Sequence, residues 1–140
     1  MQKIDLFDYN FHDSTIKDVG YDGKVLTLYI LDSYYENTYS NLNIKICIEE
    51  YDLDIIYIKQ YPVFHKVKFK GKVLDFDSLK KLFIKGYMLE INEFFVSADS
   101  DFVVFECALC PYEKKRGYYK KILLKMKDIK NFYFENSVSD

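Results

Sequence analysis

The fold is decided by residues 15–30, which read TIKDVGYDGKVLTLYI. Two runs rich in β-branched and aromatic residues, 15–21 and 24–30, flank the dipeptide Asp22-Gly23. Asp-Gly is favoured in two-residue type I′ hairpins, in which both central residues take a positive φ. The stretch therefore predicts an antiparallel β-hairpin with a type I′ turn.

The alternation of apolar and polar residues continues along most of the chain. It predicts further strands at 42–49, 53–59, 64–70, 88–96, 102–109, 118–127 and 129–135. Eight or nine short strands at this spacing are typical of an all-β domain. We expect a mostly β protein, an antiparallel sandwich or barrel of about eight strands, with residues 1–140 forming a single domain.

The period changes at one place. Asp77-Ser78 offers an N-cap, Leu79, Leu82 and Phe83 follow at helical spacing, and Gly86 stands where a helix commonly stops. This predicts one short helix over 78–86. Because a helix of two turns is unstable by itself, we expect it to dock over an open end of the β structure.

Composition places the chain among globular proteins. Hydrophobic residues make up 49% and charged residues 30%, and no apolar run is long enough to span a bilayer. The start, MQKIDLFDYN, lacks the apolar segment of a signal peptide. Three cysteines make no disulfide framework. We therefore expect a cytoplasmic protein with reduced thiols. Its excess of Lys, Ile, Asn and Tyr favours a low-GC bacterial genome.

Catalytic signatures are absent from the sequence. The five glycines are too widely separated to form a phosphate-binding loop, and there is no G-x-S-x-G motif. Cys107-Ala-Leu-Cys110 ends a predicted strand, in which positions 107 and 110 point to opposite faces. A structural role is favoured over a metal or redox role. We name no catalytic residue, metal or cofactor.

On the strand predicted at 64–70, His65 shares a face with Val67 and Phe69, and Lys66, Lys68 and Lys70 share the other. The apolar residues are expected to face the core. His65 is then a hydrogen-bonded core residue or, if the β structure encloses a cavity, a binding residue in its wall.

The segment Phe11-His12-Asp13-Ser14-Thr15-Ile16 precedes the first hairpin. With that hairpin, it resembles the opening of small bacterial proteins, some of which are labelled possible toxin-immunity proteins. The resemblance implies a mostly β fold and no established catalytic residues. From the residues themselves, Asp13 and Ser14 are turn formers and His12 can close the same turn. The alternative is a metal or catalytic role for Asp8, His12 and Asp13.

Charge is segregated along the chain. Residues 1–63 carry 5 basic and 11 acidic groups, whereas residues 113–130 carry 8 and 2. Lysines on one face of a strand, such as Lys121, Lys125 and Lys127, could bind an anion or nucleic acid, or simply form a hydrated surface. Because 19 of the 20 basic residues are lysine and the pI is about 5.7, we expect no nucleic-acid partner.

Residues 32–41 form a polar stretch that carries Tyr34, Tyr35 and Tyr39. It is either a loop that uses its tyrosines for recognition or an extension of the flanking strands with tyrosines packed inward. We expect a protein-binding, immunity-like module in which this stretch meets a basic protein partner. Asp32 and Glu36 would then tune the association rate. The alternatives are a small-molecule-binding β-barrel and, third, a hydrolase using His12 or His65. A homo-oligomer stays open.

Overall fold

The computed structural model describes residues 2–3, 11–35, 38–64, 66–97, 102–111, 119–129 and 131–136. Within these ranges, the side chains at 2–3, 32–35, 38–40, 131–132 and 134–136 lie outside the description. His65 and Glu36 lie outside the described residues, as does Asp8.

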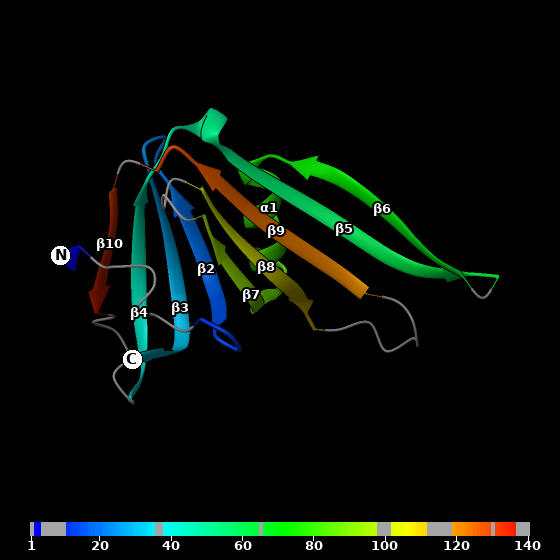
Figure 1. Ribbon diagram of the computed structural model, residues 1–140, viewed down its shortest axis with the longest axis horizontal. Coiled ribbons are helices and arrows are strands. Elements are labelled where there is room, and N and C mark those ends of the chain that lie inside the picture. The colour runs from blue at the N-terminus through cyan, green and yellow to red at the C-terminus, as the bar shows by residue number, and fades with distance from the viewer. Residues whose placement is uncertain are drawn as a thin grey trace.

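The described strands form one antiparallel sheet. The strands are β1 (Gln2–Lys3), β2 (Thr15–Tyr21), β3 (Val25–Tyr35), β4 (Thr38–Cys47), β5 (Leu53–Val63), β6 (Lys66–Leu74), β7 (Met88–Val96), β8 (Phe102–Cys110), β9 (Tyr119–Lys127) and β10 (Asn131–Asn136). Their order is β1-β10-β4-β3-β2-β7-β8-β9-β5-β6 (Figure 1). The predicted mostly β fold is confirmed. The sheet is not closed into a barrel, because β1 and β6 stand at its two ends.

Two short connections force this sheet to curl. Six strand-to-strand steps separate β4 from β5, and six separate β9 from β10, which is about 29 Å in a flat sheet. The chain from Cys47 to Leu53 spans at most about 21 Å, and the chain from Lys127 to Asn131 about 14 Å. The ends of these strands therefore meet on one side of the molecule, at the upper left of Figure 1.

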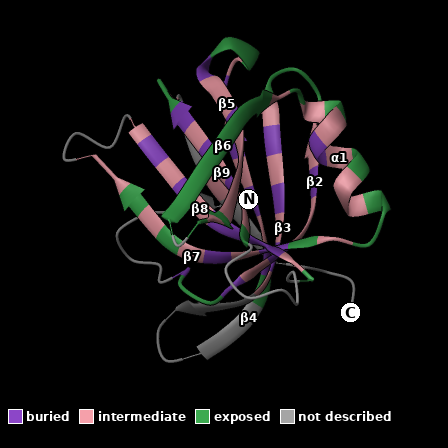
Figure 2. Ribbon diagram, turned by 90° about the vertical axis from the view of Figure 1, so that its right-hand side faces the viewer, coloured by how far each residue is buried: buried purple, intermediate pink, exposed green. Residues whose placement is uncertain are grey.

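The curled sheet buries one face. Buried side chains lie opposite one another from strand to strand, as in the pairs Leu28–Ile44, Ile91–Cys107 and Phe105–Leu124. They form one cluster that draws on β2, β3, β4, β5, β7, β8 and β9. Along β3, β4, β7 and β9 more buried and less buried residues alternate (Figure 2), as expected when each strand turns one face to a core.

The first hairpin lies where the sequence predicts it, but its turn differs. The central residues are Gly23 and Lys24, and of these only Gly23 has a positive φ, of 96°. Glycine at the first central position is the pattern of a type II′ turn and not of type I′. Asp22 Oδ1 accepts hydrogen bonds from the amides of Lys24 at 2.9 Å and Val25 at 2.7 Å. These amides lower the pKa of Asp22.

One α-helix occurs in the described part of the chain, α1 (Phe76–Ile84), together with a 3-10 turn, η2 (Glu50–Asp52). The helix begins two residues earlier than predicted, because Asp75, and not Asp77 or Ser78, is the N-cap. Its predicted stop is confirmed: Gly86 has a φ of 97°. Leu79 is buried in the core cluster of the sheet.

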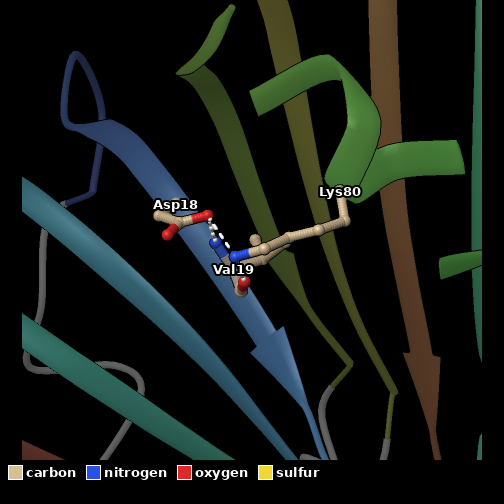
Figure 3. A network of polar contacts seen from close by, with 3 residues as sticks. All are labelled: Asp18, Val19 and Lys80. Carbon is tan, nitrogen blue, oxygen red and sulfur yellow. Dashed lines mark hydrogen bonds and ion pairs between the residues drawn. The ribbon is translucent and has the colours of Figure 1, made fainter. Parts of the chain in front are cut away.

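A lysine fastens the helix to the sheet beside β2. Lys80 Nζ lies 2.7 Å from Asp18 Oδ1 and donates a second hydrogen bond of 2.7 Å to the carbonyl oxygen of Val19 (Figure 3). The pairing of β2 with β3 shifts register between Ile16 and Asp18. This irregularity precedes the two residues that Lys80 contacts. No helix among the described residues is long and apolar enough to cross a membrane.

The prediction of which face of β6 points to the core is wrong. Val67 and Phe69 are exposed and do not face the core. Register gives the reason: Leu74 pairs with Ile55, which is buried, so the even-numbered residues of β6 share the core-facing side of the sheet. Lys66, Lys68 and Lys70 therefore lie on the inner face and the apolar residues on the outer face.

The N-cap supplies a prediction about pH. The side chain and backbone of Ser78 donate to Asp75 and lower its pKa. A carboxyl with a lowered pKa in the folded protein stabilises it above the ordinary pKa, about 3.9, and this stabilisation disappears as the pH falls through the lowered value. We expect Asp75→Ala to lower the melting temperature at pH 7, with a difference from wild type that vanishes in acid. The matched control is Asp77→Ala, which removes another exposed acidic residue, in the first turn of the helix. Equal losses for both variants would contradict the capping role.

Candidate functional site

The segment Phe11–Ser14 is a tight turn with a buried residue at each end. Ser14 N donates to the Phe11 carbonyl oxygen at 3.0 Å, and Asp13, with a φ of 67°, donates from its amide to Ile91 O at 2.8 Å. Phe11 and Ser14 are buried. The Phe11 ring packs edge-on against Phe94 and Phe105, with centroids 5.0 and 5.7 Å away. The turn thus joins the chain to the core and to β7.

The side chains of His12 and Asp13 point away from this core. His12 Nδ1 lies 3.1 Å from Asp13 Oδ2, and the two side chains are 57% and 73% exposed. Among the described residues, no three His, Cys, Asp or Glu side chains are grouped so that they could hold a metal ion. The geometry assigns His12 and Asp13 to the surface of a structural turn.

The two cysteines of the C-x-x-C motif lie in β8. Cys107 is fully buried between Ile91 and Ile122 of the neighbouring strands, and this burial raises the pKa of its thiol. Cys110 lies on the other face, 4.0 Å from Glu90 Oε2. The two cysteine side chains point to opposite faces of the strand, as predicted. This orientation prevents both sulfur atoms from ligating one ion.

Most of the stretch 32–41 is β-strand and not loop. Strands β3 and β4 extend into it as a hairpin, with Ser33 opposite Ser40, Tyr34 opposite Tyr39 and Tyr35 opposite Thr38. Of the two alternatives left open by the sequence, the backbone is that of extended strands. The direction of the tyrosine side chains lies outside the described part of the structure, so their recognition role stays a prediction.

A hollow of about 450 Å³ lies on the outer face of β2, β3, β4 and β10. Gly20, Thr27, Lys45 and Tyr133 occupy one row across these strands and line it, together with Cys47. Gly20 contributes no side chain to the row. Tyr21, at the end of β2, packs against the core cluster on the other face of the sheet and donates its hydroxyl to Ile48 O at 2.9 Å. Burial, and then the nearby Glu49, raise the pKa of Tyr21.

The hairpin of β5 and β6, here called the arm, carries a second surface. It projects to the right of the sheet in Figure 1, and β6 is exposed along nearly its whole length in Figure 2. On its outer face Val67, Phe69 and Val73 are 54%, 68% and 72% exposed. The register continues this face over Ile56 and Ile58 of β5 to Leu123 and Tyr119 of β9. We call these seven residues the outer apolar surface.

The inner face of the arm is basic. Lys66, Lys68, Lys70 and Lys72 alternate along β6 and are all exposed; we call them the lysine row. Lys70 lies opposite Lys59 of β5, which lies opposite Lys120 of β9. Lys72 Nζ lies 5.7 Å from the centroid of the Tyr57 ring. By contrast, the lysines on the outer face of β9 have contacts with neighbouring strands: Lys121 pairs with Glu106 at 2.9 Å, and Lys125 lies over the Phe102 ring.

The sequence prediction missed the arm because its features depend on which strand lies at the end of the sheet. One residue in the sequence could have indicated which face of β6 points to the core. Leu74 is apolar and stands at an even-numbered position, as the lysines of the lysine row do, and it comes just before the helix that docks on the core. Comparisons with known proteins add nothing to this geometry: no family model, curated protein or solved structure matches the chain.

The turn at 11–14 yields a stability prediction. Removing the Phe11 side chain leaves a cavity beside Phe94 and Phe105, so Phe11→Ala should destabilise the protein by about 3–5 kcal/mol. His12→Ala, at an exposed position of the same turn, should change stability by less than about 0.5 kcal/mol. Urea unfolding measures both. A larger loss from His12→Ala than from Phe11→Ala would contradict the structural role of the turn.

The cysteines yield a second prediction. Cys107→Ser places a hydroxyl in an apolar site and should cost about 1–3 kcal/mol, whereas Cys110→Ser should cost little. Because Cys107 is buried and its pKa is raised, an aromatic disulfide reagent should modify the native protein at the partly exposed Cys47 and Cys110 and spare Cys107 until it unfolds. Peptide mapping identifies the modified thiols. Rapid labelling of native Cys107 would contradict its burial.

Proposed function

We propose that this protein is a protein-binding module and that the outer apolar surface of the arm is its contact surface. The exposure of Val67, Phe69 and Val73 on one edge of the sheet carries the proposal. Scattered exposed apolar residues are ordinary, but a contiguous apolar patch on a folded protein typically marks a binding site.

The neighbourhood of these residues has the composition of an interface. Ile56, Ile58 and Leu123 extend the apolar centre across β5 and β9. Polar groups lie among them. Gln60 stands in the same row as Phe69 and Tyr119, and Lys121 of β9 forms an ion pair with Glu106 of the adjoining β8. An apolar centre with polar groups around it is the usual arrangement of a recognition surface. Phe64, which is 92% exposed at the tip of the arm, adds an aromatic side chain for a partner to contact.

The resemblance of residues 11–16 to possible toxin-immunity proteins agrees with a binding protein of this class. A basic partner at residues 32–41 remains a separate proposal, because that stretch lies elsewhere in the sheet, on β3 and β4. In both proposals the protein acts by contact with another protein and has no chemical step of its own.

A second candidate function is the binding of a small molecule in the hollow on the outer face of β2, β3, β4 and β10. Its volume of about 450 Å³ falls within the range of small-molecule sites. Lys45 and Tyr133 would favour an anionic or aromatic ligand. This site differs from the interior cavity expected of a barrel, because the core-facing side chains fill the inside of the curled sheet.

Affinity capture from the source cells tests the protein-binding function. Wild type should retain a defined partner, and Phe69→Ser with Val73→Ser should lose it while melting within a few degrees of wild type. The matched control replaces two exposed apolar residues away from the arm, Tyr51→Ser with Ile84→Ser, and should retain the partner.

Two results would count against the proposal. Retention of the partner by the Phe69/Val73 variant places the contact surface away from the arm. Absence of any partner that survives washing with wild type, from cells that express the protein at its natural level, contradicts the protein-binding function itself.

A further inference from the structure

We propose that β6 binds an extended segment of a partner protein by strand addition, and that this segment alternates acidic with apolar side chains. The inference rests on the proposed protein-binding function and specifies the geometry and chemistry of the partner.

The first observation is an open edge. β6 ends the strand order and pairs only with β5 among the described strands. In an antiparallel edge strand, every second residue directs its N–H and C=O away from the sheet. All nine residues of β6 except Leu74 are exposed, so nothing in the described structure covers this edge. Nine residues offer a pairing length of about 30 Å.

The second observation is that the two faces of β6 differ in chemistry. The lysine row lies on the inner face, and Val67, Phe69 and Val73 lie on the outer face. Side chains of an added strand lie beside those of β6 on the same face, where opposite charges and apolar pairs are favourable. A segment that pairs with β6 therefore matches it best with carboxylates on its inner face and apolar side chains on its outer face.

The described residues place no compensating charge beside the lysine row. No carboxylate in the described residues lies within ion-pair distance of Lys66, Lys68, Lys70 or Lys72. Lys70 moreover lies directly opposite Lys59, an arrangement in which like charges repel. Carboxylates brought in by a partner strand would relieve this repulsion, so charge complementarity favours an acidic segment.

Gly71 adds a third observation on the same strand. It lies between Phe69 and Val73 on the outer face, opposite Ile58. A glycine inside a strand weakens it and often marks the place where another backbone approaches closely. Here it leaves one side of Ile58 without a neighbouring side chain, and an apolar residue of the added strand can occupy that space.

Other occupants fit these observations less well. A second copy of the chain would place one lysine row beside another in antiparallel pairing, and would place each lysine row beside the apolar residues of the other copy in parallel pairing. A nucleic acid would use the lysines but would leave the open edge and the outer apolar surface uncovered. Lysines on an edge strand can also serve only to prevent aggregation, but that role does not explain three large apolar side chains exposed on the same strand.

Synthetic peptides test the proposal through fluorescence anisotropy. The acidic peptide has ten residues in which Glu alternates with Val, and the basic peptide has Lys in place of Glu. We expect wild type to bind the acidic peptide about tenfold or more tightly than the basic one. Two further acidic peptides are N-methylated at every second residue, one at the odd-numbered positions and the other at the even-numbered positions. Methylation of the set that donates to β6 removes several hydrogen bonds and should weaken binding about tenfold or more.

Charge reversal provides the matched pair of proteins. Reversal of the lysine row (K66E, K68E, K70E and K72E) should shift the preference to the basic peptide. The control reverses four other exposed lysines, K24E, K81E, K85E and K127E, so that both proteins have the same net charge. The control should keep the preference of wild type, because only the lysine row lies beside an added strand.

Three results would overturn strand addition. The first is that the acidic and basic peptides bind equally. The second is that both N-methylated peptides bind as tightly as the unmodified acidic peptide. The third is that the protein binds a twenty-nucleotide single-stranded DNA in preference to the acidic peptide. The protein-binding function is judged separately, by partner capture with the Phe69/Val73 variant. Loss of capture together with failure of the acidic peptide refutes strand addition and leaves the protein-binding function in place.

Discussion

The structure depends on two short connections, one from β4 to β5 and the other from β9 to β10. Each joins strands that are six positions apart in the sheet, and neither is long enough to cross a flat sheet of that width. The sheet must therefore curl until the ends of these strands meet. Curling turns one face of each strand inward, and the side chains on those faces form the core cluster. Tyr21 adds a hydrogen bond from the end of β2 to Ile48, just beyond β4, near the point where the connections begin.

The same constraint leaves the arm outside the core. β5 begins at the curled end, where Ile55 is buried, and continues for 11 residues into a region where its inner face carries Tyr57, Lys59 and Tyr61. β6 returns along it with lysines on the inner side. Lysines can occupy the inner face because the arm leaves the core before they occur. The apolar residues of β6 then face outward, at an end of the sheet that no described residue covers, where the proposed partner would have access.

The local elements could be predicted because short-range patterns determine them. The predicted bounds of β2 and β7 agree with the structure, and the helix is displaced by only two residues because Asp75 competes successfully with Asp77 for the capping position. The facing of β6 could not be predicted from alternation alone. Alternation shows which residues share a face, whereas the inner face is set by pairing with β5 and, through it, with β9, some fifty residues away in sequence. The candidate site was missed for the same reason: an edge is a property of the strand order, and both lysines and apolar residues also occur on covered strands. At residues 11–16 the turn-forming types of Asp13 and Ser14 predicted a turn, which the structure has, and the buried Phe11 side chain anchors it to the core.

Amide hydrogen exchange of the free protein, resolved by residue with NMR, tests the central claim that β6 is an open, pairing-competent edge. Along residues 66–74 we expect slow and fast amides in alternation, slow where the N–H bonds to β5 and fast where it faces solvent. Addition of the acidic peptide should slow the fast set alone. Uniformly slow exchange in the free protein would show that the edge is already covered. Uniformly fast exchange would show that the arm does not form a hairpin. Either result would contradict the account.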